Sequence, residues 1–194
     1  MASVKPITRE ELLDLAAYEK IRDAFLRSVI ERKKPRYVKL GESMTALFEN
    51  RDTVLLQIQE MLRTERITQE AAIAYELETY NALVPGEREL SLTLFIEYQD
   101  RDERERMLAA LAGLEDKFRL RVGSELLLVI PDARGTDRER TMAVHYLKFP
   151  LTETAFAAFM AGGAPVSLEV EHAAYSAVTE LSAATLLSLR GDFS

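Results

Sequence analysis

The spacing of hydrophobic positions divides the chain into short helices and strands. Over the first 35 residues the apolar side chains recur at helical intervals, which predicts a helix from Thr8 to about Lys34 and allows a break near Ala17. Thr8 and Glu11 have the spacing of a capping box, in which two side chains satisfy free backbone groups at the helix start. Pro35 ends the helix, because the residue before a proline disfavours helical backbone.

The middle of the chain predicts a β-hairpin followed by two helices. The predicted elements are strands 37–40 and 44–49 and helices of about 52–65 and 69–83. Asn50 or Asp52 is the expected N-cap of the first of these helices, and Thr68 is the expected N-cap of the second. Because the connection between them is short, we expect the two helices to lie antiparallel.

The second half of the chain repeats one pattern of elements. Residues 94–130 and residues 142–181 each predict a strand, a helix and two further strands. A charged loop is expected at 131–140, and Ser182 is the expected cap of a last helix, 183–189. The two units can share one sheet about a pseudo-twofold axis, with helices on one face. The alternative is an accidental match, since this order of elements is common in α+β folds.

These elements predict an α+β fold with a largely antiparallel sheet, an N-terminal helix and an antiparallel helix pair. The length of 194 residues suits a single domain. Within it we distinguish an N-terminal helical segment, 1–35, a hairpin and helix pair, 36–86, and the two strand–helix–strand–strand units, 87–194. A sheet with helices on one face leaves its other face apolar, so we expect a homodimer that covers this face.

The residue types that are missing exclude several chemistries. The chain has no cysteine, which removes disulfides, thiolate metal sites and cysteine nucleophiles. It has only two histidines, so a three-histidine metal site within one chain is impossible. No phosphate-binding Gly-rich loop and no Gly-x-Ser-x-Gly motif occurs. We therefore expect no cofactor and no stoichiometric metal ion.

Charge and hydropathy indicate where the protein works. The net charge is −7, although residues 1–40 carry ten Lys and Arg against six Asp and Glu. Several of these cations follow a predicted helix, where they complement the negative end of its dipole, so we expect no nucleic-acid partner. No apolar run is long enough to span a membrane, and the start does not resemble a secretory signal. We expect a cytoplasmic protein without a membrane partner.

Long polar side chains gather at the start and along one side of the predicted helix 52–65. They are Glu49, Asn50, Arg51, Gln57, Glu60 and Arg63. Such a set can surround a carboxylate or phosphate ligand near a helix N-terminus. The alternative is a structural role, with Glu60 and Arg63 as an intrahelical ion pair beside a helix cap. For Arg51 we expect a partly buried contact with Glu78 or Glu49.

The two histidines are the remaining candidates for chemistry. His145 shares a strand face with Leu147 and Phe149, a setting typical of a hydrogen-bonded core histidine, although it is also a candidate ligand-binding residue. If its strand lay beside the strand that ends in His172, the two imidazoles and a carboxylate would form a metal site. The sequence spacing does not establish this arrangement, and we do not expect it.

Several stretches of the chain are distinctive as a set. They are Tyr-Glu-Lys-Ile-Arg at 18–22, Phe-Glu-Asn-Arg-Asp-Thr at 48–53, and the segments 57–63, 80–85 and 90–97. Together they resemble a bacterial family of uncharacterised proteins, domain of unknown function number 3501, from about Leu15 to Tyr175. Where the family is expected to have His-Pro-x-Tyr, this chain has His172-Ala173-Ala174-Tyr175, without the rigid proline turn.

The resemblance implies a context and assigns no catalytic residue. Such proteins are often encoded beside a rubrerythrin and an iron–sulfur oxidoreductase-like protein, which implies a redox protein as partner. Our leading hypothesis is therefore a non-enzymatic binding or accessory protein of a redox or peroxide-stress system. The alternative is a small-molecule enzyme whose site combines Arg51, Gln57, Glu60 and Arg63 with His145. The sequence does not decide whether the protein is an enzyme.

Overall fold

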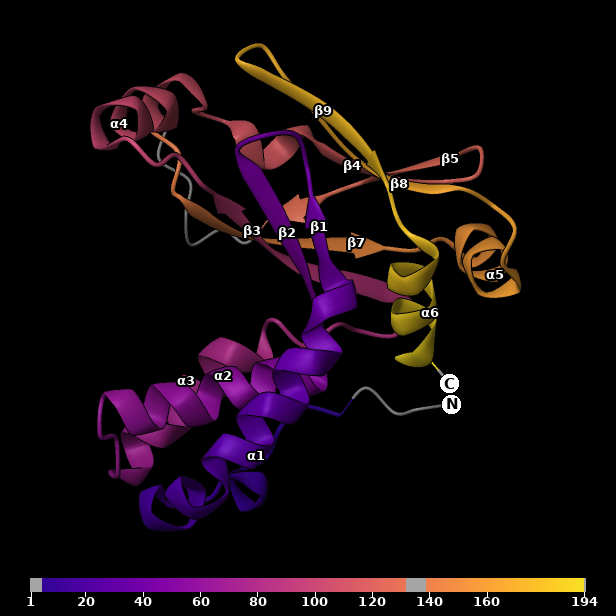
Figure 1. Cartoon of the computed structure of the whole chain (residues 1–194). Coiled ribbons are helices and arrows are strands. Elements are labelled where there is room, and N and C mark those ends of the chain that lie inside the picture. The colour runs from indigo at the N-terminus through magenta and orange to yellow at the C-terminus, as the bar shows by residue number, and fades with distance from the viewer. Residues whose placement is uncertain (1–4, 132–138, 194) are drawn as a thin grey trace.

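The computed structural model describes residues 5–131 and 139–193 (Figure 1). The helices are η1 (Arg9–Glu11), α1 (Leu15–Lys33), η2 (Lys34–Arg36), α2 (Arg51–Thr64), α3 (Glu70–Asn81), α4 (Arg101–Ala110), η3 (Leu114–Lys117), α5 (Glu153–Ala161) and α6 (Ala183–Gly191), where η marks a 3₁₀-helix. The strands are β1 (Tyr37–Lys39), β2 (Met44–Glu49), β3 (Glu89–Ile96), β4 (Phe118–Val122), β5 (Glu125–Leu128), β6 (Ile130–Pro131), β7 (Val144–Pro150), β8 (Val166–His172) and β9 (Tyr175–Glu180). Most of the loop expected at 131–140 lies outside the described residues.

The N-terminal helix is interrupted earlier than the sequence indicates. The capping box of Thr8 and Glu11 is present, but it opens only the short helix η1. The chain is extended at Leu12, whose side chain is buried. Asp14 then caps α1, accepting a hydrogen bond from the Ala17 amide at 2.7 Å. Two N-capping side chains in one short stretch start two helices, so the break lies at Leu12 to Asp14 and not near Ala17, where we allowed for one.

Most other helix starts lie where their capping residues predict. Asn50 caps α2 by accepting from the Thr53 amide at 3.0 Å, and Ser182 caps α6. The expected cap at Thr68 is wrong, because α3 starts after Gln69 without a side-chain cap. The antiparallel helix pair α2 and α3 follows the hairpin of β1 and β2, as predicted.

The strands form two antiparallel sheets instead of the single sheet that we expected. Sheet A has the order β1-β2-β3-β7-β6, and sheet B has the order β5-β4-β8-β9. Alternate side chains of β3, such as Leu92 and Leu94, join Leu120 and Leu168 of sheet B in the main hydrophobic core. The opposite face of sheet A carries Tyr146, which packs against the core of α2 and α3. Packing two sheets face to face buries the apolar face of each unit, which one shared sheet would leave open.

The two repeated units pair with each other strand by strand. β3 pairs with β7 in sheet A, and β4 pairs with β8 in sheet B. In sheet B, Phe118 lies opposite Val170, Leu120 opposite Leu168 and Val122 opposite Val166, so the register is symmetric about the middle pair. The helices α4 and α5 lie at opposite ends of the sheets and not on one common face as expected (Figure 1).

Candidate functional site

Two of the polar residues selected from the sequence face helix α1. The carboxylate of Glu60 accepts a hydrogen bond from the Tyr18 hydroxyl at 2.7 Å and two from the Arg22 guanidinium, each at 2.8 Å. Arg63 pairs with Glu19, its Nε lying 2.7 Å from a carboxylate oxygen. The expected intrahelical pair of Glu60 and Arg63 is therefore wrong. Their opposite charges are used across the interface between α1 and α2.

The electrostatics of this interface follow from its hydrogen bonds. The Arg22 guanidinium lowers the pKa of the Glu60 carboxyl, and the Tyr18 hydroxyl acts in the same direction. Burial, followed by the neighbouring Glu60 carboxylate, raises the pKa of the Tyr18 hydroxyl. At neutral pH the cluster is thus a carboxylate held by one guanidinium and one neutral phenol.

Arg51 makes a different contact from the two that we expected. Its Nη2 lies 2.5 Å from a carboxylate oxygen of Glu11, and its Nε donates to the Lys5 carbonyl at 3.0 Å. The expected pairing with Glu78 or Glu49 is wrong, because the η1 turn brings its own carboxylate over the start of α2. Gln57, on the same helix, is half-buried, and its side-chain amide makes no hydrogen bond to another described residue.

Glu49 and Asn50 lie at the buried junction between sheet A and α2. Glu49 is only 4% exposed and accepts hydrogen bonds from the Thr93 hydroxyl, at 2.6 Å, and from the Thr53 hydroxyl. The amide nitrogen of Asn50 donates to Asp192 at 2.9 Å. Both side chains therefore form hydrogen bonds with other side chains of the fold, and neither is directed at a cavity by these contacts.

A buried arginine, which the sequence analysis did not select, completes this junction. Arg36 is 1% exposed, and its guanidinium donates to the carbonyls of Phe48, at 2.7 Å, and Glu49, at 3.0 Å. It also pairs with the Asp192 carboxylate at 2.7 Å. In sequence, Arg36 ends a run of cations after a helix, so nothing but its position directly before a strand distinguishes it from its solvated neighbours.

His145 lies in the core between the sheets, away from the polar residues of α2. Its Nε2 is 2.9 Å from the Thr141 hydroxyl and 2.8 Å from the Met142 carbonyl. Burial lowers the pKa of the imidazole, so it is neutral at pH 7. His172 instead places its Nε2 3.2 Å from the Ala112 carbonyl. Among residues 5–131 and 139–193, no cluster of three or more His, Asp or Glu side chains is arranged to hold a metal ion.

The structure thus divides the predicted site into separate places. Glu60 and Arg63 face α1, Arg51 faces η1, and the buried Glu49 lies with the half-buried Asn50 at the junction. His145 belongs to the core on the other side of sheet A. Each charged member of the set has a partner within the chain, so these residues do not converge on one cavity.

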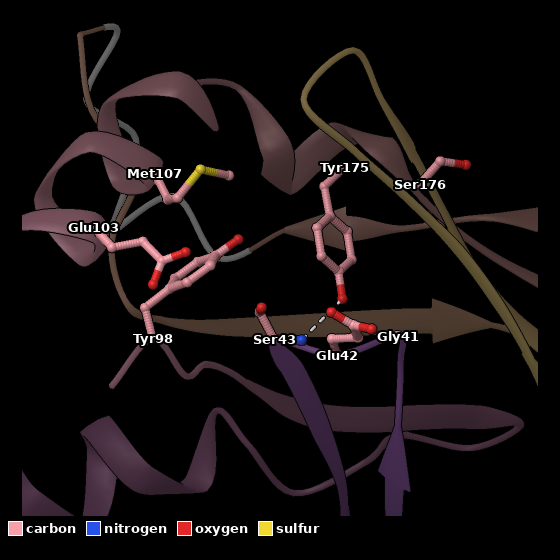
Figure 2. Close-up of a pocket in the computed structure, with 8 residues that line it drawn as sticks. All are labelled: Gly41, Glu42, Ser43, Tyr98, Glu103, Met107, Tyr175 and Ser176. Carbon is pink, nitrogen blue, oxygen red and sulfur yellow. Dashed lines mark hydrogen bonds between the residues drawn. The ribbon is translucent and has the colours of Figure 1, made fainter. Parts of the chain in front are cut away.

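A different group of residues does converge on a cavity (Figure 2). The pocket has a volume of about 420 Å³ and lies between the β1–β2 turn, α4 and the start of β9. We call it the tyrosine pocket. Its lining residues are Gly41, Glu42, Ser43, Tyr98, Glu103, Met107, Tyr175 and Ser176. Glu103 and Met107 are four residues apart on α4, which places both side chains on the same helix face.

Tyr175 forms one wall of the tyrosine pocket and joins the two sheets. Its hydroxyl donates to the Leu40 carbonyl at 2.6 Å and accepts from the Ser43 amide at 3.2 Å. Gly41 has a φ of +69°, and a Cβ at this position would lie 2.3 Å from the Tyr175 hydroxyl oxygen. The β1–β2 turn therefore needs glycine both for its backbone and for the close approach of the ring.

The hairpin that carries Tyr175 is the segment where we expected a proline turn in the family and this chain has two alanines. Ala173 and Ala174 form its two-residue turn between β8 and β9. The Ala174 amide donates to Nδ1 of His172 at 3.1 Å, so a side chain fixes this turn in the absence of proline. The turn is thus ordered by a hydrogen bond that the sequence analysis did not foresee.

The charge of the tyrosine pocket is not balanced. Neither Glu42 nor Glu103 is joined through its carboxylate to any of the described residues, by ion pair or hydrogen bond. The ring of Tyr98 lies beside the Glu103 carboxylate, with Tyr175 on the far side of the opening (Figure 2). Among the residues that the structure describes, no lysine or arginine lines the pocket. The sequence analysis missed this site, and its only signal was the unusual stretch ending in Tyr175.

The fold and this site define an α+β protein in which a two-sheet core positions a small acidic and aromatic pocket. The family model "Protein of unknown function (DUF3501)" matches residues 6–193, and the chain belongs to this family. A crystal structure of a novel protein of unknown function from Burkholderia pseudomallei K96243 is similar, with a TM-score of 0.90 and 39% identity. The alignment covers 97% of this chain and 99% of that chain. A search of curated proteins finds no match. Among the described residues, no helix combines the length and apolarity needed to cross a membrane.

Proposed function

We propose that the protein is a non-enzymatic binding protein whose tyrosine pocket takes a small organic cation, such as a protonated amine. The observation that carries this proposal is the convergence of two carboxylates, Glu42 and Glu103, without a cation from the described residues. A bound ammonium group would supply the missing positive charge.

The other lining residues fit the same ligand class. Tyrosine faces attract cations through the negative potential of the ring, and Tyr98 lies beside the Glu103 carboxylate (Figure 2). Met107 adds an adaptable apolar surface for the carbon skeleton of the amine. An anionic ligand of the same size would instead meet two like charges.

The side-chain contacts favour binding over catalysis. The residues of the alternative enzyme hypothesis, Arg51, Glu60 and Arg63, are engaged by carboxylates or by a guanidinium from other elements. Within the tyrosine pocket, the Tyr175 hydroxyl is occupied by two backbone groups, so it already has its own donor and acceptor.

A pair of probes of matched size tests the ligand class. Phenethylamine and phenylacetate have similar skeletons and opposite charges, and their binding is measured by isothermal titration calorimetry. We expect the amine to bind and the acid not to bind. Recovery of unmodified phenethylamine after incubation, checked by mass spectrometry, is expected for a binding protein and would be contradicted by a converted product.

Substitutions on α4 test the place of binding. Glu103→Gln should weaken phenethylamine binding roughly 3- to 10-fold, the range expected for one partly solvated charge pair. Asp102→Asn removes the same charge from the adjacent position, outside the lining of the pocket, and should leave binding unchanged. Equal losses in both variants, or equal binding of phenylacetate, would refute the proposed site.

The resemblance and the composition extend the proposal to partners and location. We infer a cytoplasmic homodimer that accompanies a redox protein, with the redox group carried by that partner, since this chain has no cysteine. Adding a rubrerythrin encoded in the same genome should give a heavier complex in light scattering. A mixture that elutes as two separate components would contradict this part of the proposal.

A further inference from the structure

The outer face of sheet B is open where the outer face of sheet A is covered. The inward side chains of β4 and β8, such as Leu120 and Leu168, are fully buried in the core between the sheets. On the opposite face, Leu128 of β5 is 64% exposed and Val178 of β9 is 67% exposed. The helices α1, α2 and α3 lie on the far side of sheet A from this surface (Figure 1). Two large apolar side chains therefore stand in solvent at the two edges of one sheet.

The register of the strands places charged residues between these two apolar edges. Arg119 of β4 lies opposite Leu128 on one side and opposite Glu169 of β8 on the other. Glu169 lies in turn opposite Val178 of β9. One row across the outer face thus reads Leu128, Arg119, Glu169, Val178, with the apolar residues outside and the opposite charges in the middle.

The next row extends the same separation of charge. This row reads Leu126, Arg121, Ser167, Glu180, and Arg121 pairs with Glu169 of the first row at 2.6 Å. Cations therefore occupy the β4 side of the face, and carboxylates occupy the β8 and β9 side. The exposed carboxylate of Glu180 has no partner among the described residues.

The first row is complementary to itself under a twofold rotation, whereas in the second row the same rotation sets Leu126 against Glu180 of the other copy. A rotation axis that runs parallel to the strands, midway between β4 and β8, places β8 of a second copy over β4 and β5 over β9. The row then meets itself in reverse, so that Leu128 faces the partner's Val178 and Arg119 faces the partner's Glu169. An isologous dimer requires this kind of self-complementary surface, in which each residue meets the counterpart of its own partner.

We propose that the outer face of sheet B is the homodimer interface and that its occupant is a second copy of this chain. Two apolar contacts would form at the edges, and Arg119 of each copy would lie beside the existing Arg121–Glu169 pair of the other copy. This inference rests on the homodimer of the proposed function and is independent of the ligand in the tyrosine pocket.

Two variants test this interface, because neither should form a dimer alone and the two should form a heterodimer when mixed. Val178→Lys and Leu128→Glu each place a charge against an apolar side chain of an identical partner. Mixing them creates one lysine–glutamate contact and leaves one native contact of leucine with valine. Mass measured by light scattering and native mass spectrometry should be twice the chain mass of 21.9 kDa for the unchanged protein. Each variant alone should be a monomer, and an equimolar mixture should recover a heterodimer.

A surface variant elsewhere serves as the control. Leu187→Lys changes a residue of α6 that is 74% exposed, and it should remain a dimer. An unchanged protein that is monomeric across the micromolar range would overturn the homodimer itself. A dimer that persists in both single variants, or a mixture without heterodimer, would overturn this surface while leaving the homodimer in place. Phenethylamine binding in the variants tells whether the pocket is intact in either case.

Discussion

The α1–α2 interface and the tyrosine pocket both place carboxylates beside tyrosines, but they balance the charge differently. Glu60 receives three hydrogen bonds, from Tyr18 and Arg22, and its neighbour Arg63 has Glu19. In the tyrosine pocket, Glu42 and Glu103 receive none from the described residues. The first set joins two helices, whereas the second has no partner among the described residues and is the place of the proposed ligand. Residue type alone does not distinguish the two, since they differ in their partners and in burial: Glu60 is half-buried, and Glu42 and Glu103 are exposed.

The comparison also explains why the polar run on α2 attracted attention. Long charged side chains along one helix suggest a binding surface until a second helix is packed against them. Here α1 supplies Arg22 and Glu19, which lie about 40 residues earlier in the chain, as hydrogen bonds with sequence separations of 38 and 44 show. A charge that is already paired gains little from a ligand, because the ligand must replace an existing contact.

The largest effect is expected where a charge is buried and fully paired. Arg36→Ala should destabilise the fold by about 3–5 kcal/mol, because Asp192 loses its charged partner and keeps only Asn50, and two backbone carbonyls lose this buried donor. Chemical denaturation followed by circular dichroism measures this change. Arg32→Ala, on the exposed end of α1, is the matched control and should be nearly silent. Similar losses in the two variants would contradict the structural role of the junction.

A smaller loss is expected at the wall of the tyrosine pocket. Tyr175→Phe removes only the hydroxyl and leaves the Leu40 carbonyl and the Ser43 amide without that partner. The expected cost is about 1–3 kcal/mol for two neutral hydrogen bonds. Thermal denaturation of this variant beside Tyr75→Phe, which changes a tyrosine that is 66% exposed, measures the difference. Equal melting temperatures in the two variants would show that the hydrogen bonds of the Tyr175 hydroxyl to the β1–β2 turn contribute nothing to stability.

The direct test of the comparison removes one carboxylate from each region. Glu60→Gln should destabilise the protein by about 1 kcal/mol, since Arg22 and Tyr18 lose a charged acceptor that is partly screened by solvent. Glu103→Gln should leave stability unchanged, because its carboxylate has no partner among the described residues to lose. Urea denaturation of both variants under one set of conditions measures the two changes in unfolding free energy. A stable Glu60→Gln protein together with a weakened Glu103→Gln protein would reverse the assignment of the two regions.

The smallest effect is expected in the pH dependence. Burial lowers the pKa of His145 below its ordinary value of 6.5, so the unfolded chain takes up a proton first as the pH falls. Stability should therefore be constant above about pH 6.5 and decline below it. The Glu60 carboxyl, whose pKa is also lowered, contributes stability that is lost only below its ordinary value of 4.5.

Replacing the imidazole separates these two windows of pH. His145→Gln should flatten the decline that begins near pH 6.5 and preserve the one below 4.5. Unfolding free energies measured at closely spaced pH values provide the readout. A decline of unchanged slope near pH 6.5 in the variant would exclude His145 as its origin.

Local signals in the sequence determined most of the secondary structure. Capping by Asn50 and Ser182, the stop at Pro35 and the alternation along β3 depend on residues a few positions apart, so they are legible without tertiary contacts. The repeated order of strand, helix, strand and strand could be predicted from the sequence for the same reason. Where two local signals competed, as for Thr8 and Asp14 at the start of the chain, only the structure decided which began the long helix.

The tertiary structure alone decided how the elements share the core and which polar groups are free. No local sequence signal indicates whether Leu92 and Leu120 belong to one sheet or to two, because apolar and polar residues alternate along a strand in the same way in both cases. Nothing local paired Glu60 with Arg22 or left Glu103 open, because those outcomes depend on side chains brought together from distant segments. The sequence by itself therefore determined the elements and the absence of cysteine chemistry. The place of the candidate site depends on long-range packing, since only folding decides which carboxylates are left without a partner.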